Sequence, residues 1–172
     1  VELYRYSGAD TAVAVPSTLD GKKATSIGYW AFQYASGVTN VKIPNTVTKI
    51  GGRAFINTKI TSMDIPNSVK EIGAYAFSSC NSLTNISVPN SVTKIGMHAF
   101  DFCKSLKSIT IPNSVTNMDA ITFWGCSNLE TIKLSSGLTS ILRWSFRDCT
   151  KLKSIIIPKS ITSISDYAFY ND

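Results

Sequence analysis

Apolar and polar residues alternate along this chain in a pattern that returns at a fixed spacing. Within residues 83–88, Leu83, Ile86 and Val88 are apolar, and the polar Ser87 separates Ile86 from Val88. The alternation of Ile86 and Val88 predicts a short strand with one buried face. Pro89 lacks a backbone donor and therefore ends this strand, and the Asn-Ser pair that follows is typical of a turn.

A second extended piece and a turn complete the unit. Residues 92–95 predict another short extended piece with both apolar side chains inward, and Gly96 lets the backbone bend after it. Residues 97–103 have apolar side chains at helical spacing, which predicts about one turn of helix with Phe100 and Cys103 facing the core. A single unit cannot bury these side chains alone, so the units have to stack.

The unit recurs almost to the end of the chain, which decides the architecture. Successive copies should pair strand on strand, about 4.8 Å apart. This regularity leaves no room for a domain boundary and predicts one domain, residues 1–172. The Phe that closes each unit stands at positions 32, 55, 77, 100, 123, 146 and 169. The predicted repeats are residues 13–37, 38–59, 60–82, 83–105, 106–128, 129–151 and 152–172.

Both ends of the array depart from the repeat. Residues 1–12 predict an N-terminal cap, in which the alternating residues 2–6 form a hairpin with a strand around residues 12–15. The first repeat carries an insert whose Asp20-Gly21 pair predicts an exposed hairpin tip. The last repeat stops where a Cys is expected and has no polar cap. We therefore expect the solenoid to continue, or to be capped, beyond Asp172.

The four cysteines occupy one position of successive units. Their spacing excludes zinc ribbons and redox pairs, which need two Cys close in sequence. Stacking would bring their Cα atoms within reach of a disulfide, but the same position also suits small buried thiols. Ala35 and Thr58 at the equivalent position favour the packing role. The cysteines are Cys80, Cys103, Cys126 and Cys149.

Composition and charge narrow the class of protein. Hydrophobic residues make up 44% of the chain and charged residues 16%, as in a folded domain. No apolar run is long enough to insert into a membrane. The net charge of +6 is spread over scattered Lys and Arg, which argues against nucleic-acid binding. It favours either acidic partners or simply a soluble, Lys-rich surface. The chain does not begin with Met, so we expect further domains of the same protein outside it.

The sequence offers no constellation for catalysis. It has no cofactor motif, metal-ligand cluster, paired carboxylates or nucleophile motif, so we expect no enzyme activity and no cofactor. The single His98 precedes Asp101 by three residues but lacks a nucleophile. Equivalent positions in other units hold various large side chains, so His98 is predicted to be a surface residue.

The repeat resembles a known family. The run Leu-x-x-Ile-x-Ile-Pro-Asn-Ser-Val-Thr-x-Ile-Gly-x-x-Ala-Phe-x-x-Cys, nearly complete at residues 60–80, 83–103 and 106–126, resembles the BspA-like, or Treponema-type, leucine-rich repeats. The resemblance implies a repeat solenoid with a curved parallel β-sheet on its concave face and short extended pieces and helical turns on the other faces. It also implies a cell-surface or secreted protein of a host-associated bacterium, or less commonly of a protist, with a role in adhesion.

Two surfaces of such a solenoid are candidates for binding. Outward strand positions carry Lys, Ser and Thr, which either bind a partner or are simply favourable exposed strand residues. A column of large side chains on one flank either recognises a ligand or covers the core. The candidates are Lys107, Thr110, Lys133 and Lys153 on the strands, and Trp30, Tyr75, Trp144 and Tyr167 on the flank.

These observations favour a non-enzymatic binding module that mediates adhesion or protein–protein recognition through the repeat surface. Its expected partner is a host matrix or cell-surface protein, or a glycan. Two alternatives stay open at this level. The chain could be a structural spacer in a larger surface protein, or a glycan-binding module.

Overall fold

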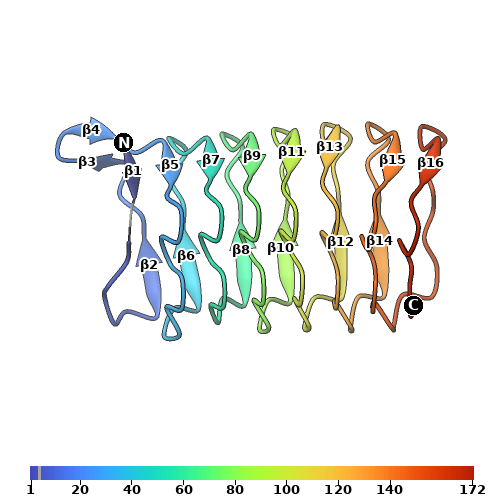
Figure 1. Ribbon diagram of the computed structural model, residues 1–172. Coiled ribbons are helices and arrows are strands. Elements are labelled where there is room, and N and C mark those ends of the chain that lie inside the picture. The colour runs from blue at the N-terminus through green and yellow to red at the C-terminus, as the bar shows by residue number, and fades with distance from the viewer. Residues whose placement is uncertain (4) are drawn as a thin grey trace.

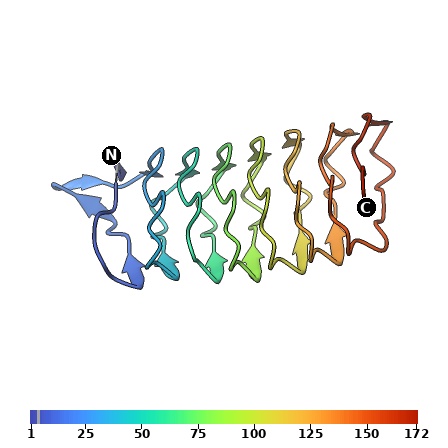
Figure 2. The same cartoon turned by 60° about the horizontal axis from the view of Figure 1, so that its bottom comes forward.

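The chain forms a parallel β-solenoid of about seven turns (Figure 1). The computed structural model describes residues 1–3 and 5–172. Successive coils lie side by side along one axis, and all but the last carry two short strands at equivalent places (Figure 2). The predicted repeat solenoid is therefore confirmed. The described residues contain no helix, and thus none long and apolar enough to cross a membrane.

The first stack of strands comes from the Ile-x-Ile-Pro part of the repeat. From β6 onward the middle residue of each of these strands is buried and its neighbours are exposed, as the alternation predicts. Parallel pairs form between β2 and β6, β8 and β10, and β12 and β14. The strands are β2 (Ala12–Ala14), β6 (Asn40–Lys42), β8 (Ser62–Asp64), β10 (Asn85–Ser87), β12 (Ser108–Thr110) and β14 (Thr131–Lys133).

The second stack comes from the short extended piece after the turn. Six two-residue strands form a parallel sheet in the order β1-β5-β7-β9-β11-β13, and β15 pairs with β16 beyond it. Its apolar residues align coil on coil and point into the core. The strands are β1 (Glu2–Leu3), β5 (Ser26–Ile27), β7 (Lys49–Ile50), β9 (Glu71–Ile72), β11 (Lys94–Ile95), β13 (Asn117–Met118), β15 (Ser140–Ile141) and β16 (Ser163–Ile164).

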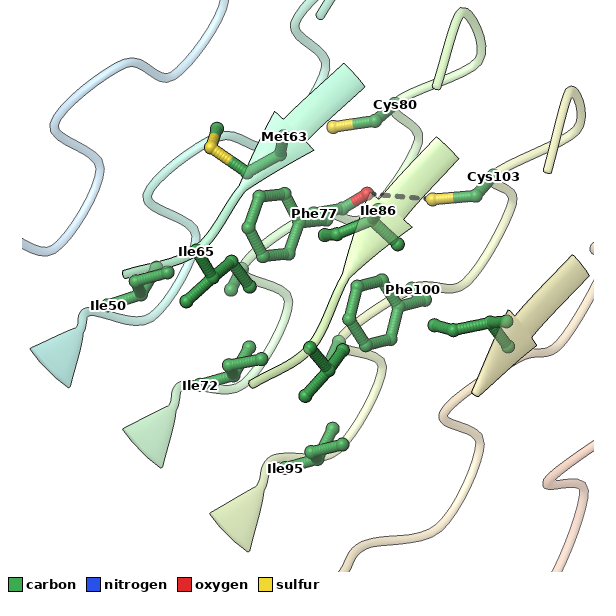
Figure 3. Close-up of a cluster of buried hydrophobic side chains, with 14 of the residues drawn as sticks. Ile50, Met63, Ile65, Ile72, Phe77, Cys80, Ile86, Ile95, Phe100 and Cys103 are labelled. Carbon is green, nitrogen blue, oxygen red and sulfur yellow. Dashed lines mark hydrogen bonds between the residues drawn. The ribbon is translucent and has the colours of Figure 1, made fainter. Parts of the chain in front are cut away.

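A column of phenylalanine rings runs through the core between the two stacks (Figure 3). Consecutive rings from Phe32 to Phe169 lie 5.1 to 5.7 Å apart between centroids, with planes within 12° of parallel. All but Phe169 are fully buried. Each ring is covered by the ring of the next coil, which is why one unit cannot be stable alone.

The turn after each short strand is not helical, so this detail of the prediction is wrong. The amide of Ala99 donates to the carbonyl of Gly96 within the turn, at 3.2 Å. The next amide, that of Phe100, donates to the carbonyl of Thr122 in the following coil, at 3.0 Å. Because alternate amides bond to the neighbouring coil, they are not free for the i to i−4 bonds of a helix.

The N-terminal residues do not form the predicted hairpin. Strand β1 joins the two-residue stack by pairing with β5, whereas β2 joins the other stack by pairing with β6. The segment is thus an incomplete coil, and its Tyr6 ring stacks on Phe32 at 5.4 Å to cover the end of the phenylalanine column. Tyr4, part of the predicted strand, lies outside the described residues.

The hairpin tip in the first repeat is confirmed. Strand β3 (Thr18–Leu19) pairs antiparallel with β4 (Lys22–Lys23). The connecting Asp20 and Gly21 both have positive φ, 49° and 72°, as a tight two-residue hairpin turn requires.

The last coil exposes a position that is buried in earlier coils. Ile156 is 84% exposed and Ile164 is 51% exposed, whereas the residues at the position of Ile164 in earlier coils, such as Ile95, are buried. Continuation of the solenoid beyond Asp172 stays a prediction.

Candidate binding surfaces

Strands β12 and β14 place two of the predicted strand-face residues, Thr110 and Lys133, next to each other. Thr110 lies opposite Lys133 in the parallel register, and Lys133 forms a further parallel bridge to Ile156 of the last coil. Lys107 and Lys153 stand three residues before Thr110 and Ile156 in their own coils, and both are exposed. We call these five residues, Lys107, Thr110, Lys133, Lys153 and Ile156, the lysine patch.

Ile156 is the member of the lysine patch that sequence reasoning did not select. Its outward column otherwise holds Lys42, Asp64, Ser87, Thr110 and Lys133, so an apolar residue there was a usable signal. With Leu134 and Pro158, Ile156 lines a hollow of about 400 Å³ on the strand face. An exposed apolar side chain beside such a hollow is a feature of interaction sites.

The face that carries the lysine patch has a net positive charge. Glu130 occupies the outward column between Lys107 and Lys153, so three ammonium groups share the face with one carboxylate. No ion pair neutralises these lysines within residues 1–3 and 5–172. Their charge is therefore available to an acidic partner.

The predicted aromatic flank forms a stripe in which arginines lie between the rings. Trp30 and Tyr75 are joined by Arg53, whose guanidinium carbon lies 6.0 and 4.5 Å from their ring centroids. Trp144 and Tyr167 are joined in the same way by Arg143, at 4.2 and 5.4 Å. These two clusters are connected: the His98 ring lies 4.4 Å from Tyr75 and 6.3 Å from Trp124, and Arg147 lies over both Trp124 and Trp144.

Arginine was the signal that sequence reasoning missed at the second cluster. Arg143 and Arg147 stand on either side of the predicted column, and Arg147 lies over Trp124, Trp144 and Tyr170 at 5.4, 5.6 and 5.2 Å. The sequence prediction compared a single position of each repeat, so it did not reveal cation–π contacts between different positions.

The flank column has an unusual backbone conformation. Its residues all have φ between 55° and 65°, the left-handed region that most side chains avoid. The turn therefore imposes this conformation on whichever residue occupies the position, including the β-branched Ile121. The members are Trp30, Arg53, Tyr75, His98, Ile121, Trp144 and Tyr167.

His98 is not the surface residue that we predicted. Its side chain is only 13% exposed, its ring stacks on Tyr75 at 4.4 Å, and its Nδ1 lies 2.6 Å from Oδ2 of Asp101. The large residue of the neighbouring coil covers the imidazole, which the sequence column did not reveal. Burial raises the pKa of the Asp101 carboxyl above its ordinary value, although the hydrogen bond from His98 opposes this shift.

The cysteine column is a ladder of free, buried thiols. The Sγ of Cys103 donates to the backbone carbonyl of Phe77 in the preceding coil at 3.1 Å (Figure 3). Cys80, Cys126 and Cys149 make the same contact with the Phe carbonyl one coil earlier. The structure therefore supports the packing role over disulfides. Within the described part of the chain, no group of three or more His, Cys, Asp or Glu residues is placed to hold a metal ion.

Comparison with known proteins agrees with this architecture. The sequence matches the family model of the BspA type leucine-rich repeat region, in six copies, over residues 17–129 and 70–172. A search of curated protein sequences found no significant match.

Several solved bacterial structures are similar to this chain. A leucine-rich repeat protein from Bacteroides ovatus is 39% identical, with a TM-score of 0.85 over 92% of this chain and 43% of its own. A leucine-rich cell surface protein from Faecalibacterium prausnitzii is 32% identical, with a TM-score of 0.55 over 92% and 50%. A leucine-rich repeat protein from Eubacterium ventriosum is 26% identical, with a TM-score of 0.85 over 99% and 45%. The chain thus spans about half the length of these relatives or slightly less.

Proposed function

Because the chain belongs to the BspA-type leucine-rich repeat family, we propose that it is a non-enzymatic binding module of a bacterial cell-surface or secreted protein. In this proposal it mediates adhesion by recognising a host matrix or cell-surface protein through side chains from several coils.

The lysine patch is the observation that carries the proposal. It joins three consecutive coils, and the pairing of Thr110, Lys133 and Ile156 holds its row in a fixed register. Residues fixed by strand pairing lose little entropy when a partner binds, so a patch on strands suits recognition. The exposed Ile156 adds an apolar side chain at the end of the row, next to Lys133, and protein interfaces combine apolar and polar groups in this way.

The positive charge of the patch specifies the kind of partner. Three lysines against one glutamate favour an acidic protein surface, and they would accelerate association at low ionic strength. A surface location is supported by the 32% identical relative from Faecalibacterium prausnitzii, which is described as a cell surface protein.

Binding to immobilised matrix proteins, measured by surface plasmon resonance, tests the proposal. The wild-type chain is compared with the triple variant Lys107→Glu, Lys133→Glu and Lys153→Glu, and with Ile156→Ser. The matched control reverses three exposed lysines outside the patch, Lys22, Lys23 and Lys70, to Glu.

The expected result is salt-sensitive binding to at least one acidic matrix protein. The patch variants should weaken this binding by about tenfold or more, while the control retains it. Undiminished binding by the triple Lys→Glu variant would show that the lysine patch is not the binding surface.

A spacer role is the second candidate, favoured by the backbone hydrogen bonds that join each turn to the next coil along the stacked solenoid (Figure 1). It predicts no binding to any matrix protein by a correctly folded chain. The same assay therefore separates the two functions.

A further inference from the structure

We propose that the flank between the last two coils holds a second site, which binds one acidic sugar residue of a glycan. The site is a hollow of about 200 Å³ lined by Arg143, Trp144, Arg147, Tyr167 and Tyr170, which we call the flank pocket. It rests on the proposed role of the chain as a binding module, but it is distinct from the lysine patch.

The flank pocket is built by alternating guanidinium groups and aromatic rings. Arg143 lies between Trp144 and Tyr167, and Arg147 lies between Trp144 and Tyr170. Tyr167 and Tyr170 meet edge to face at 5.8 Å between centroids. Each guanidinium carbon lies within 6 Å of two ring centroids of the pocket, and these contacts restrict the guanidinium groups before any ligand arrives, so little conformational entropy remains to be lost on binding.

Arg143 and Arg147 differ in whether a carboxylate of the protein already binds the guanidinium group. Arg147 donates from Nε to the carboxylate of Asp148 at 3.3 Å. Asp148 also accepts from Trp124 Nε1 at 2.7 Å and from Asn171 Nδ2 at 3.0 Å, and these hydrogen bonds hold its pKa below the ordinary value. Asp148 is thus an ionised partner for Arg147.

Arg143 keeps its charge available to a ligand. It is exposed and makes no ion pair with any residue that the structure describes. The corresponding arginine of the other cluster, Arg53, donates instead to the hydroxyl of Tyr29. A guanidinium held on its faces by rings still presents planar N–H donors at its edge, which match a carboxylate or sulfate group.

The remaining surface of the flank pocket fits a sugar ring. A pyranose has apolar C–H faces and polar hydroxyl edges, so it requires aromatic faces beside hydrogen-bonding groups. Tyr167 and Tyr170 are 53% and 46% exposed and supply both. Five residues line the hollow, whereas each partner in a stable protein interface contributes about 20–30 residues, which favours one sugar residue over a protein partner.

Titration by ¹⁵N–¹H NMR, observing the indole signal of Trp144, tests this inference with small probes. The probes are matched pairs that differ in one acidic group, namely glucuronate with glucose and N-acetylglucosamine 6-sulfate with N-acetylglucosamine. We expect millimolar binding of at least one acidic sugar, at least about tenfold tighter than its neutral counterpart. Which pair responds distinguishes a carboxylate ligand from a sulfate ligand.

Variants assign the binding to Arg143. Arg143→Gln should weaken binding of the acidic sugar by about tenfold to a hundredfold, because it removes a charge-assisted pair of hydrogen bonds. Arg143→Lys keeps the charge but loses the planar fork, so it should weaken binding less. The control Lys22→Gln removes an equal charge from the distant hairpin and should leave binding unchanged.

Three results would overturn the inference: no shift of the Trp144 signal with any acidic sugar, equal binding of the neutral counterparts, or full binding by Arg143→Gln. The titrations of the wild-type chain decide the first two even if a variant fails to fold. Failure of this site would leave matrix-protein binding through the lysine patch unaffected, since the two assays use different residues and different ligands.

Discussion

Replacing a ring in the middle of the phenylalanine column should cost much more stability than replacing the ring in the last described coil. Phe100 is fully buried, and its ring lies 5.4 Å from Phe77 and 5.5 Å from Phe123. Phe100→Ala therefore leaves a cavity that neighbouring coils cannot fill without breaking their pairing. The expected loss is about 3–5 kcal/mol.

Phe169 has a ring neighbour on one side only, Phe146 at 5.3 Å, and is only partly buried. Phe169→Ala loses one stacking contact and roughly half the buried area, so we expect a loss of about 1–2 kcal/mol.

Urea unfolding, followed by circular dichroism and by tryptophan fluorescence, measures both losses. Phe100→Leu is the matched control, because it keeps most of the volume and should cost less than Phe100→Ala. Equal losses of unfolding free energy for Phe100→Ala and Phe169→Ala would refute this reasoning. They would mean that the contribution of a ring does not depend on how completely neighbouring coils bury it.

Three further predictions follow from individual positions. Ile121→Asn should stabilise the chain by about 0.5–1 kcal/mol in urea unfolding, because Asn tolerates the positive φ of this position better than a β-branched residue; Ile121→Val should give no gain. The four thiols should resist Ellman's reagent until the chain unfolds, since burial raises the pKa of Cys80 to about 12 and that of Cys103 well above its ordinary value; rapid labelling of the folded chain would contradict this. Burial also raises the pKa of Asp101, so the folded chain binds this proton more readily than the unfolded chain, and stability should fall as the pH rises from the ordinary value of about 4 through the raised value. Asp101→Asn should flatten this fall in melting temperature, and an unchanged slope would count against the assignment.

The repeat pattern predicted the core because the core is periodic. Ile86 was assigned inward from its alternation with Val88, and Ile95 as an apolar residue of the second extended piece; both are buried, one on each stack. Each such residue is fixed by contact with its own counterpart one coil away, so one period contains nearly all the packing information.

The turn was mispredicted because spacing alone does not distinguish a helix from a series of tight turns. A second column of positive φ runs through the turn, and several of its members are residue types that tolerate this conformation. Asn57, Gly125, Asp148 and Asn171 were therefore a usable signal against a helix.

The candidate surfaces were only partly predictable for a different reason. Lys133 and Thr110 were found because strand register determines their neighbours. Arg143 and Arg147 were missed because they meet the rings through long side chains that reach across positions of the repeat. Single-position columns do not describe such contacts.

The bonding of alternate turn amides to the following coil makes the coils interchangeable in an evolutionary sense. The amide of Phe77 donates to the carbonyl of Ala99 just as that of Phe100 donates to the carbonyl of Thr122. In-frame duplication of residues 83–105 would therefore reproduce both junctions and lengthen the strand face by one step. Gene duplication can thus change the length of such a solenoid without requiring a new type of contact between coils.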